Sequence, residues 1–80
     1  MYTKTYVSVT ARFDTIGNIF PYKIEWEDGR VFGIDKVVDV RPCASLRCGG
    51  FGIRYTCSIK GKEAYLFYED SRWFVERKDY

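Results

Sequence analysis

Three cysteines are the most reactive side chains in this sequence of 80 residues, which contains no histidine. Cys43 and Cys48 are separated by four residues, and Cys57 follows nine positions later. A structural zinc ion normally takes four Cys or His ligands, so this set is one ligand short. We therefore expect no metal ion and no cofactor. A zinc site completed by Asp39 or by a second copy, and a Cys43–Cys48 disulfide, are the alternatives that stay open.

Catalysis by one of these thiols is not expected either. A nucleophilic cysteine needs a neighbouring base or a lowered pKa. Cys48 is next to Arg47 and two glycines, but no histidine is present to accept its proton. Asp35 and Asp39 fall on one predicted strand, where a polar strand face is the simpler explanation. The sequence thus predicts that the protein is not an enzyme, and Cys57, at an inward strand position, is predicted to be a core residue.

Basic residues are concentrated in the middle of the chain. The segment 41–62 contains five of them and no acidic residue, whereas the other eight of the 13 basic residues and all 11 acidic ones lie outside it. Arg, Lys, Ser and Thr are side chains that contact phosphate oxygens, so the segment predicts a surface for nucleic acid or another acidic partner. The alternative is a sheet face neutralised by Glu63, Glu69 and Glu76 on neighbouring strands. The predicted contact residues are Arg41, Arg47, Arg54, Thr56, Lys60 and Lys62.

Fifteen aromatic residues supply much of the surface that so small a chain can bury. A tyrosine combines an apolar ring with a polar hydroxyl, which suits an exposed groove. Tyr22, Tyr65 and Tyr68 are the predicted members of such an aromatic groove. Most of the other large rings are expected in the core, namely Phe13, Phe20, Trp26, Phe32, Phe51, Phe67, Trp73 and Phe74.

These side chains must be positioned by β-strands, because apolar and polar residues alternate with a period of two. Turn residues separate the alternating segments, and Asp28-Gly29 predicts a hairpin with a type I′ turn. Lys36 interrupts the apolar face of its strand, which predicts a β-bulge or a bend between Gly33 and Lys36. The predicted strands cover residues 7–13, 20–26, 32–40, 51–59, 64–68 and 73–76.

Alternation also predicts which side chains face the core. The second predicted strand points one set of residues to the same face, namely Phe20, Tyr22, Ile24 and Trp26. The fourth points Ile53, Tyr55, Cys57 and Ile59 inward together with Phe51. Its outward residues are then Arg54, Thr56, Ser58 and Lys60.

Five or six antiparallel strands joined by tight turns predict an all-β fold, a small SH3-like barrel with no substantial helix. An OB-like barrel is the alternative, and the lack of a helical segment disfavours it. The length predicts one domain, residues 1–80. No apolar run is long enough for a membrane-spanning helix, and no leader is visible. The odd number of cysteines then predicts a reducing, cytoplasmic location.

Three segments of the chain carry a family resemblance, namely WEDGRVFGID (residues 26–35), YLFYED (65–70) and RWFVER (72–77). Together they resemble small bacterial domain families without an assigned activity. Some members of those families look to be encoded beside translesion DNA polymerases or fused near their ends. The resemblance covers residues 24–77 and implies a barrel-like accessory module of DNA-damage tolerance, with no functional residue carried over.

The leading hypothesis from the sequence is a non-enzymatic binding module that meets an acidic partner, either nucleic acid or an acidic protein, through the segment 41–62. Its affinity for nucleic acid is then expected to fall steeply as salt rises. The second is a protein-interaction module that docks an extended peptide in an aromatic groove or on a strand edge near residues 2–9 or Pro21. A third is a homodimer in which Cys43 and Cys48 of two chains meet. Neither a membrane nor a small-molecule substrate is expected.

Overall fold

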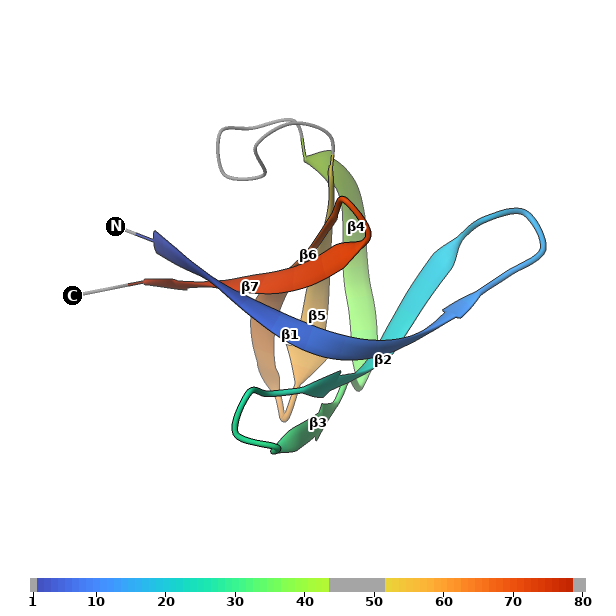
Figure 1. Cartoon of the computed structure of the whole chain (residues 1–80). Helices are drawn as coiled ribbons and strands as arrows, with labels where there is room; N and C mark the ends of the chain where they lie inside the picture. The colour runs from blue at the N-terminus through green and yellow to red at the C-terminus, as the bar shows by residue number, and fades with distance from the viewer. Residues whose placement is uncertain (1, 44–51, 79–80) are drawn as a thin grey trace.

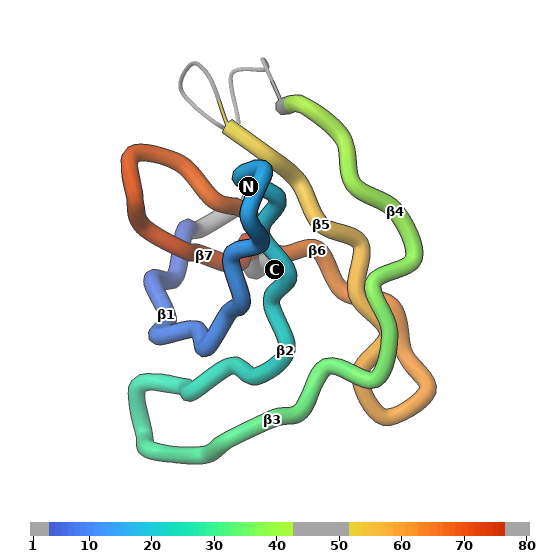
Figure 2. The backbone as a smooth tube through the Cα atoms, turned by 90° about the vertical axis from the view of Figure 1, so that its right-hand side faces the viewer, coloured from blue at the N-terminus to red at the C-terminus, as the bar shows by residue number. Residues whose placement is uncertain are grey.

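The computed structural model describes residues 2–43 and 52–78, and its regular structure is one antiparallel sheet, so the all-β prediction is confirmed. The sheet has seven strands in the order β3-β2-β1-β7-β6-β5-β4 and curls into a half-barrel (Figures 1 and 2). The strands are β1 (Tyr2–Phe13), β2 (Ile19–Glu25), β3 (Val31–Gly33), β4 (Lys36–Cys43), β5 (Gly52–Ile59), β6 (Lys62–Glu69) and β7 (Arg72–Lys78).

The strand count differs from the predicted five or six because the predicted strand 32–40 is divided. It breaks between Gly33 and Lys36, where the prediction placed a bulge or bend, and β3 and β4 lie on either side. Two hydrogen bonds hold this corner. The Ile34 N–H donates to the Tyr22 carbonyl at 2.9 Å, and the Asp35 N–H donates to the Ser58 carbonyl at 2.8 Å. The break leaves Lys36 exposed, which avoids the cost of burying its charge.

Two β-bulges change which side chains face inward. On β2 the register shifts at Tyr22, because Thr10 pairs with Lys23 while Ala11 pairs with Pro21. Ile24 therefore stays in the core, whereas Phe20 and Tyr22 are 41% and 52% exposed, and the prediction that all three share one face is wrong. A second bulge at Val38 of β4 leaves that side chain exposed as well.

The core lies on the concave side of the half-barrel. Its buried residues are Ile24, Tyr55, Cys57 and Leu66, surrounded by partly buried side chains of every strand except β3. The inward prediction for β5 is confirmed for the four residues of it that the structure describes, namely Ile53, Tyr55, Cys57 and Ile59. Phe51 lies outside the described residues.

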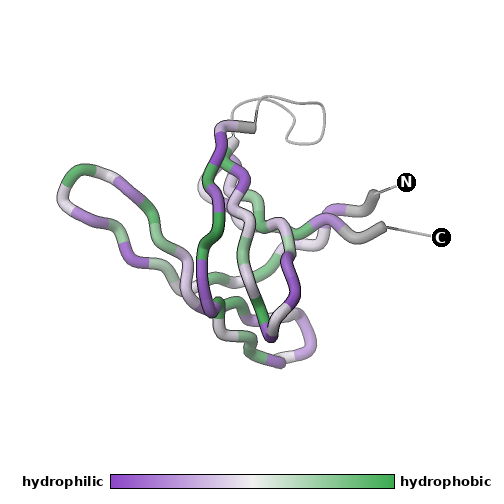
Figure 3. Tube along the Cα trace, turned by 180° about the vertical axis from the view of Figure 1, so that it is seen from behind, coloured by the Kyte–Doolittle hydropathy of each residue, from purple (hydrophilic) through white to green (hydrophobic). Residues whose placement is uncertain are grey.

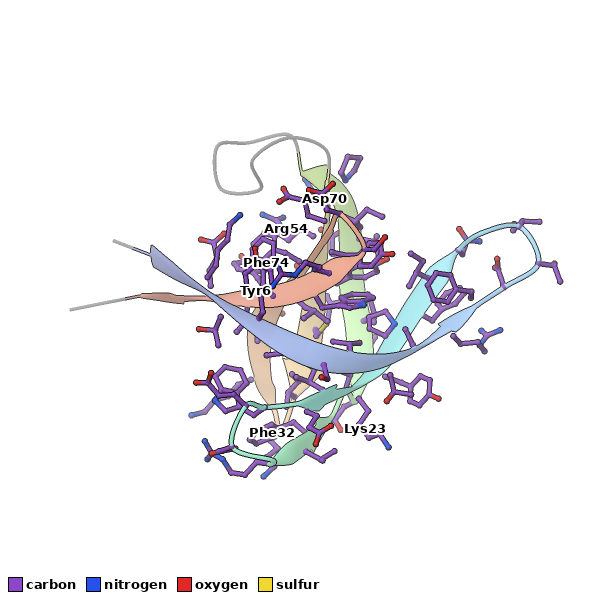
Figure 4. All side chains as sticks on the ribbon, in the orientation of Figure 1. Tyr6, Lys23, Phe32, Arg54, Asp70 and Phe74 are labelled. Atoms are coloured by element: carbon purple, nitrogen blue, oxygen red, sulfur yellow. The ribbon has the colours of Figure 1, made fainter. Side chains whose placement is uncertain are left out.

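The convex side buries a second, smaller cluster. Phe67 and Phe74 are cross-strand neighbours whose rings stack with centroids 5.1 Å apart, and each is 1% exposed or less. Tyr6 meets the Phe74 ring edge to face, with ring centroids 5.6 Å apart. Figure 4 labels the two side chains next to each other. The expectation of a mostly buried set of phenylalanines is wrong for Phe13, which is 61% exposed, and for Phe20.

Two tight turns have type I′ geometry, but the turn for which that type was predicted does not. Lys60 and Gly61 both have positive φ between β5 and β6, and so do Asp70 and Ser71 between β6 and β7, as type I′ turns require. At the Asp28-Gly29 turn only the glycine has positive φ, and the loop closes with hydrogen bonds between Trp26 and its partners Gly29 and Arg30. This hairpin therefore has a longer loop than the predicted type I′ turn.

Candidate functional site

The predicted basic surface is divided between the two ends of β5. Arg41 and Arg54 are cross-strand partners, and both approach the Asp39 carboxylate. The Arg41 Nε lies 2.7 Å from Asp39 Oδ2, and the Arg54 Nη2 lies 4.0 Å from the same oxygen. One carboxylate thus compensates part of the charge of two guanidinium groups.

The two lysines lie at the opposite end. Lys60 and Lys62 flank the β5–β6 turn, six residues beyond Arg54, or about 20 Å at the usual strand rise. The Lys60 Nζ lies 5.3 Å from the centre of the Phe32 ring, and its backbone N–H donates to Asp35 at 3.0 Å. The structure therefore brings Arg41 and Arg54 together, and Lys60 and Lys62 together, but does not join the two pairs.

The two remaining predicted contact residues do not extend either pair. Thr56 has the outward strand position that alternation predicts, but it is only 7% exposed, so its hydroxyl is not presented on an open surface. Arg47 lies outside the described residues.

The three tyrosines of the predicted aromatic groove occupy three different places. Tyr22 is the exposed bulge residue of β2, and Tyr65 is 48% exposed on β6 beneath the Arg54 guanidinium, which lies 4.8 Å from the centre of its ring. Tyr68 instead packs into the concave core against Trp73, with ring centroids 4.6 Å apart. They therefore do not form one groove.

A cleft that sequence patterns did not reveal opens where β6 and β7 separate. The two strands pair only from Leu66 to Glu69 and from Arg72 to Val75. Beyond these residues β6 continues along β5 while β7 continues along β1, so the strands diverge as a fork (Figure 1). We call the space between them, bounded also by the β2–β3 hairpin, the fork cleft.

The fork cleft is a cavity of about 710 Å³ that reaches the concave core. The cleft exposes the side chain of Ala64 to solvent, although its cross-strand partner Cys57 is fully buried. The walls are mainly apolar and come from the β2–β3 hairpin and the three strands β5, β6 and β7. They comprise Ile24, Trp26, Phe32, Cys57, Ile59, Ala64, Tyr65, Leu66 and Val75, with Arg30, Glu63 and Glu76 as the charged members.

The charges of the fork cleft are unequally compensated. Arg30 is held by Asp28, with its Nε 2.6 Å from Oδ2, and the Arg30 backbone N–H together with this guanidinium holds the pKa of Asp28 below its usual value. The Glu76 Oε1, in contrast, is buried and has no hydrogen-bond partner among the described residues. A buried carboxylate oxygen in that state is costly. Two of the three charged residues that line the cleft are acidic, and the basic one is already paired with Asp28, so the cleft favours a ligand with a positive charge.

One wall of the fork cleft is a free strand edge. Within the described residues, positions 62–65 of β6 pair with β5 alone, which leaves their other edge facing the cleft. This stretch contains neither proline nor a bulge, and Lys62, at its turn end, is its one lysine among the features that keep a further strand from pairing. The outer edges of β2 and β4, by comparison, carry Pro21, Pro42 and the two bulges.

Cys57 is part of the hydrophobic core. Cys57 is a fully buried free thiol, as predicted, and burial raises its pKa to about 11. Cys48 lies outside the described residues, so neither the zinc alternative nor the disulfide is tested. In the described parts of the chain, no three His, Cys, Asp or Glu residues gather as a metal site would require. Those parts also include no helix with the length and apolar character needed to cross a membrane.

Comparisons with protein-family models, with curated proteins and with solved structures find no match, so the resemblance to domains near translesion polymerases stays a prediction.

Proposed function

We propose that this protein is a non-enzymatic binding module that docks an extended peptide segment in the fork cleft. The observation that carries the proposal is the coincidence of a free strand edge, residues 62–65 of β6, with an apolar cavity of about 710 Å³ beside it. A peptide strand added to such an edge gains main-chain hydrogen bonds, and its alternate side chains enter the cavity. The aromatic walls formed by Trp26 and Phe32 would receive an apolar side chain.

The charges of the fork cleft favour a peptide with a lysine or arginine next to its apolar residue. Arg30 is already paired with Asp28, so Glu63 and Glu76 leave the lining of the cleft with an excess of negative charge. Glu76→Gln is expected to remove the preference for a basic residue while binding of the apolar residue persists.

The finer assignments belong to the same proposal. SH3-like barrels commonly bind extended peptides, which agrees with an SH3-like reading of the half-barrel. The three-cysteine count supports a cytoplasmic location. The accessory role in DNA-damage tolerance is supported by the sequence resemblance alone, and would make a polymerase or one of its associated proteins the source of the peptide.

Binding can be tested with a display library of random short peptides, followed by fluorescence anisotropy of the selected sequences. Ala64→Trp would fill the fork cleft from its open side and is expected to weaken binding at least about tenfold, a loss of about 1.4 kcal/mol. Thr10→Trp places the same ring on an exposed position of β1 outside the cleft and should leave binding unchanged. Circular dichroism in the near ultraviolet would show that both variants keep the aromatic core.

Two results would contradict the proposal. One is a library that yields no sequence bound by the wild-type protein. The other is a selected peptide that binds Ala64→Trp as tightly as it binds Thr10→Trp, because the peptide would then occupy another surface.

Nucleic-acid binding is the second candidate, and one contact favours it. The Arg54 guanidinium lies over the exposed ring of Tyr65, and Arg41 is its neighbour on β4. An aromatic ring beside two arginines is a platform on which an unpaired base can stack. Asp39 opposes this function because it compensates both arginines.

A further inference from the structure

The β1–β2 hairpin projects beyond the body of the half-barrel (Figure 1). β1 pairs with β7 only as far as Val7, and from there on its only partner is β2. We call residues 11–21 the arm. Its surface exposes three large apolar side chains, with Phe13 61%, Ile16 83% and Phe20 41% exposed. Hydrophobic and hydrophilic stretches alternate along the arm in Figure 3, with a hydrophobic stretch at its tip.

The tip of the arm is an ordered turn. The Asp14 carboxylate accepts hydrogen bonds from the Ile16 N–H at 3.0 Å, the Asn18 N–H at 2.8 Å and the Asn18 side-chain amide at 2.9 Å. These bonds hold the pKa of Asp14 below its usual value, the side-chain bond from Asn18 most strongly. Ile16 is therefore presented to solvent by a built turn, and solvent exposure of so large an apolar side chain in a fixed position suggests a contact surface.

A groove with apolar side chains in its lining lies beside the arm. It is a cavity of about 560 Å³ between the arm and the strands β4 and β5, and it is separate from the fork cleft. Val40 is 53% exposed there, although its cross-strand neighbour Tyr55 is 2% exposed. The groove is lined by Gly17, Asn18, Ile19, Phe20, Val37, Val40, Ile53 and Tyr55.

The strand edges that border the groove are unsuited to strand addition. β2 has Pro21 and the bulge at Tyr22, and β4 has Lys36, the bulge at Val38 and Pro42. Proline, lysine and bulges are the features that keep a sheet edge from pairing. An occupant of this groove must therefore be held by apolar side chains and not by main-chain hydrogen bonds.

We propose that the occupant is a second copy of this chain. Two copies related by a two-fold axis would each place the tip of the arm in the groove of the other. Each copy carries both halves of the contact, an apolar tip with Ile16 at its end and an apolar groove with Val40 at its mouth. In a two-fold interface both copies contribute the same surface, so the tip of each copy meets the groove of its partner.

Apolar side chains of the arm and the groove supply part of the area that a dimer needs. At roughly 150–250 Å² for a whole aromatic side chain, the exposed parts of Phe13 and Phe20 amount to about 200 Å² per copy. Ile16 and Val40, which are 83% and 53% exposed, add aliphatic surface. A standard interface buries about 800 Å² on each partner, so the polar groups around these side chains must supply the rest.

The oligomeric state of the full chain tests the proposal. We expect sedimentation equilibrium to give twice the chain mass of 9.4 kDa. Ile16→Asp should weaken the dimer by at least about tenfold, because a carboxylate would be buried in an apolar groove. Thr15→Asp is the matched control, since it places the same charge at the neighbouring exposed tip position and should remain dimeric.

Aspartate substitutions on β4 test the groove half of the contact. Val40→Asp should dissociate the dimer, whereas Val38→Asp, on the outward bulge of the same strand, should not. A monomer of wild-type protein at every concentration up to about 1 mM would overturn the proposal, and so would equal dimerisation of Ile16→Asp and Thr15→Asp. Peptide binding to the fork cleft should persist in Ile16→Asp, so failure of one proposal is distinguishable from failure of the other.

Discussion

At the scale of single residues, the buried thiol of Cys57 gives the protein a pH-dependent stability. Burial raises the pKa of this thiol from 9.0 to about 11. The folded protein therefore holds the proton more tightly than the unfolded chain does. The stabilisation is complete below pH 9 and is lost as the pH rises toward 11.

Cys57→Val is expected to reduce this loss of stability between pH 9 and 11. Urea unfolding at a series of pH values would show a flatter free energy of unfolding for the variant than for the wild-type protein. Burial also raises the pKa of Tyr55, but that residue is present in both proteins, so their difference reports Cys57. Parallel pH profiles would show that the thiol does not contribute.

The sequence predicted which side chains face the core only where no bulge interrupts the alternation along a strand. On β5 the alternation correctly assigned Tyr55 and Cys57 to the core, because no bulge lies between them. On β2 the extra residue at Tyr22 exchanges the inward and outward positions before it, so Phe20 is exposed while Ile24 stays buried. A bulge depends on how the paired strand curves, and a single sequence carries little signal of that.

At the scale of elements, the turn at the tip of the arm depends on one carboxylate. Asp14→Ala would remove three hydrogen bonds, to the Ile16 and Asn18 amides and to the Asn18 side chain. We expect faster hydrogen exchange of these two amides by NMR, after correction for intrinsic rates. Asp28→Ala removes the corresponding bond to Arg30 and is the control, since it should leave the tip unaffected.

The tip should also loosen in acid. The hydrogen bonds lower the pKa of Asp14, so the stabilisation is present above pH 3.8 and is lost as the pH falls below this value. An NMR titration that gave Asp14 an ordinary pKa would show that these bonds are weak in solution.

The elements themselves were largely predictable, whereas the fork cleft was not. Turn residues and alternation placed β5, β6 and β7 within a few residues of their observed bounds. The fork depends on β7 leaving β6 after Val75 to follow β1, whose pairing with β7 begins at residue 2. The alternation predicted the first strand only from residue 7, so the sequence held no indication that β7 has a second partner.

At the scale of the whole molecule, charge placement decides how strongly nucleic acid can bind. The net charge is only +2, and the basic residues of the segment 41–62 lie at opposite ends of β5. Five phosphate contacts to single-stranded DNA would give a salt slope of about −3.5 in log K against log salt concentration, and two would give about −1.4. Because Arg41 and Arg54 share Asp39, we expect the shallower slope for the wild-type protein.

Asp39→Asn tests whether the arginine pair is a latent nucleic-acid site. Removing the negative charge of Asp39 frees both guanidinium groups beside Tyr65, so the affinity for oligothymidine should rise. Two further phosphate contacts, four in all, would steepen the salt slope to about −2.8. Glu25→Gln makes the same charge change on the exposed side of β2 and controls for net charge. Fluorescence anisotropy across a salt series measures both quantities. Equal slopes for the two variants would mean that the two arginines contact no phosphate, and the peptide-binding function would then stand as the one candidate.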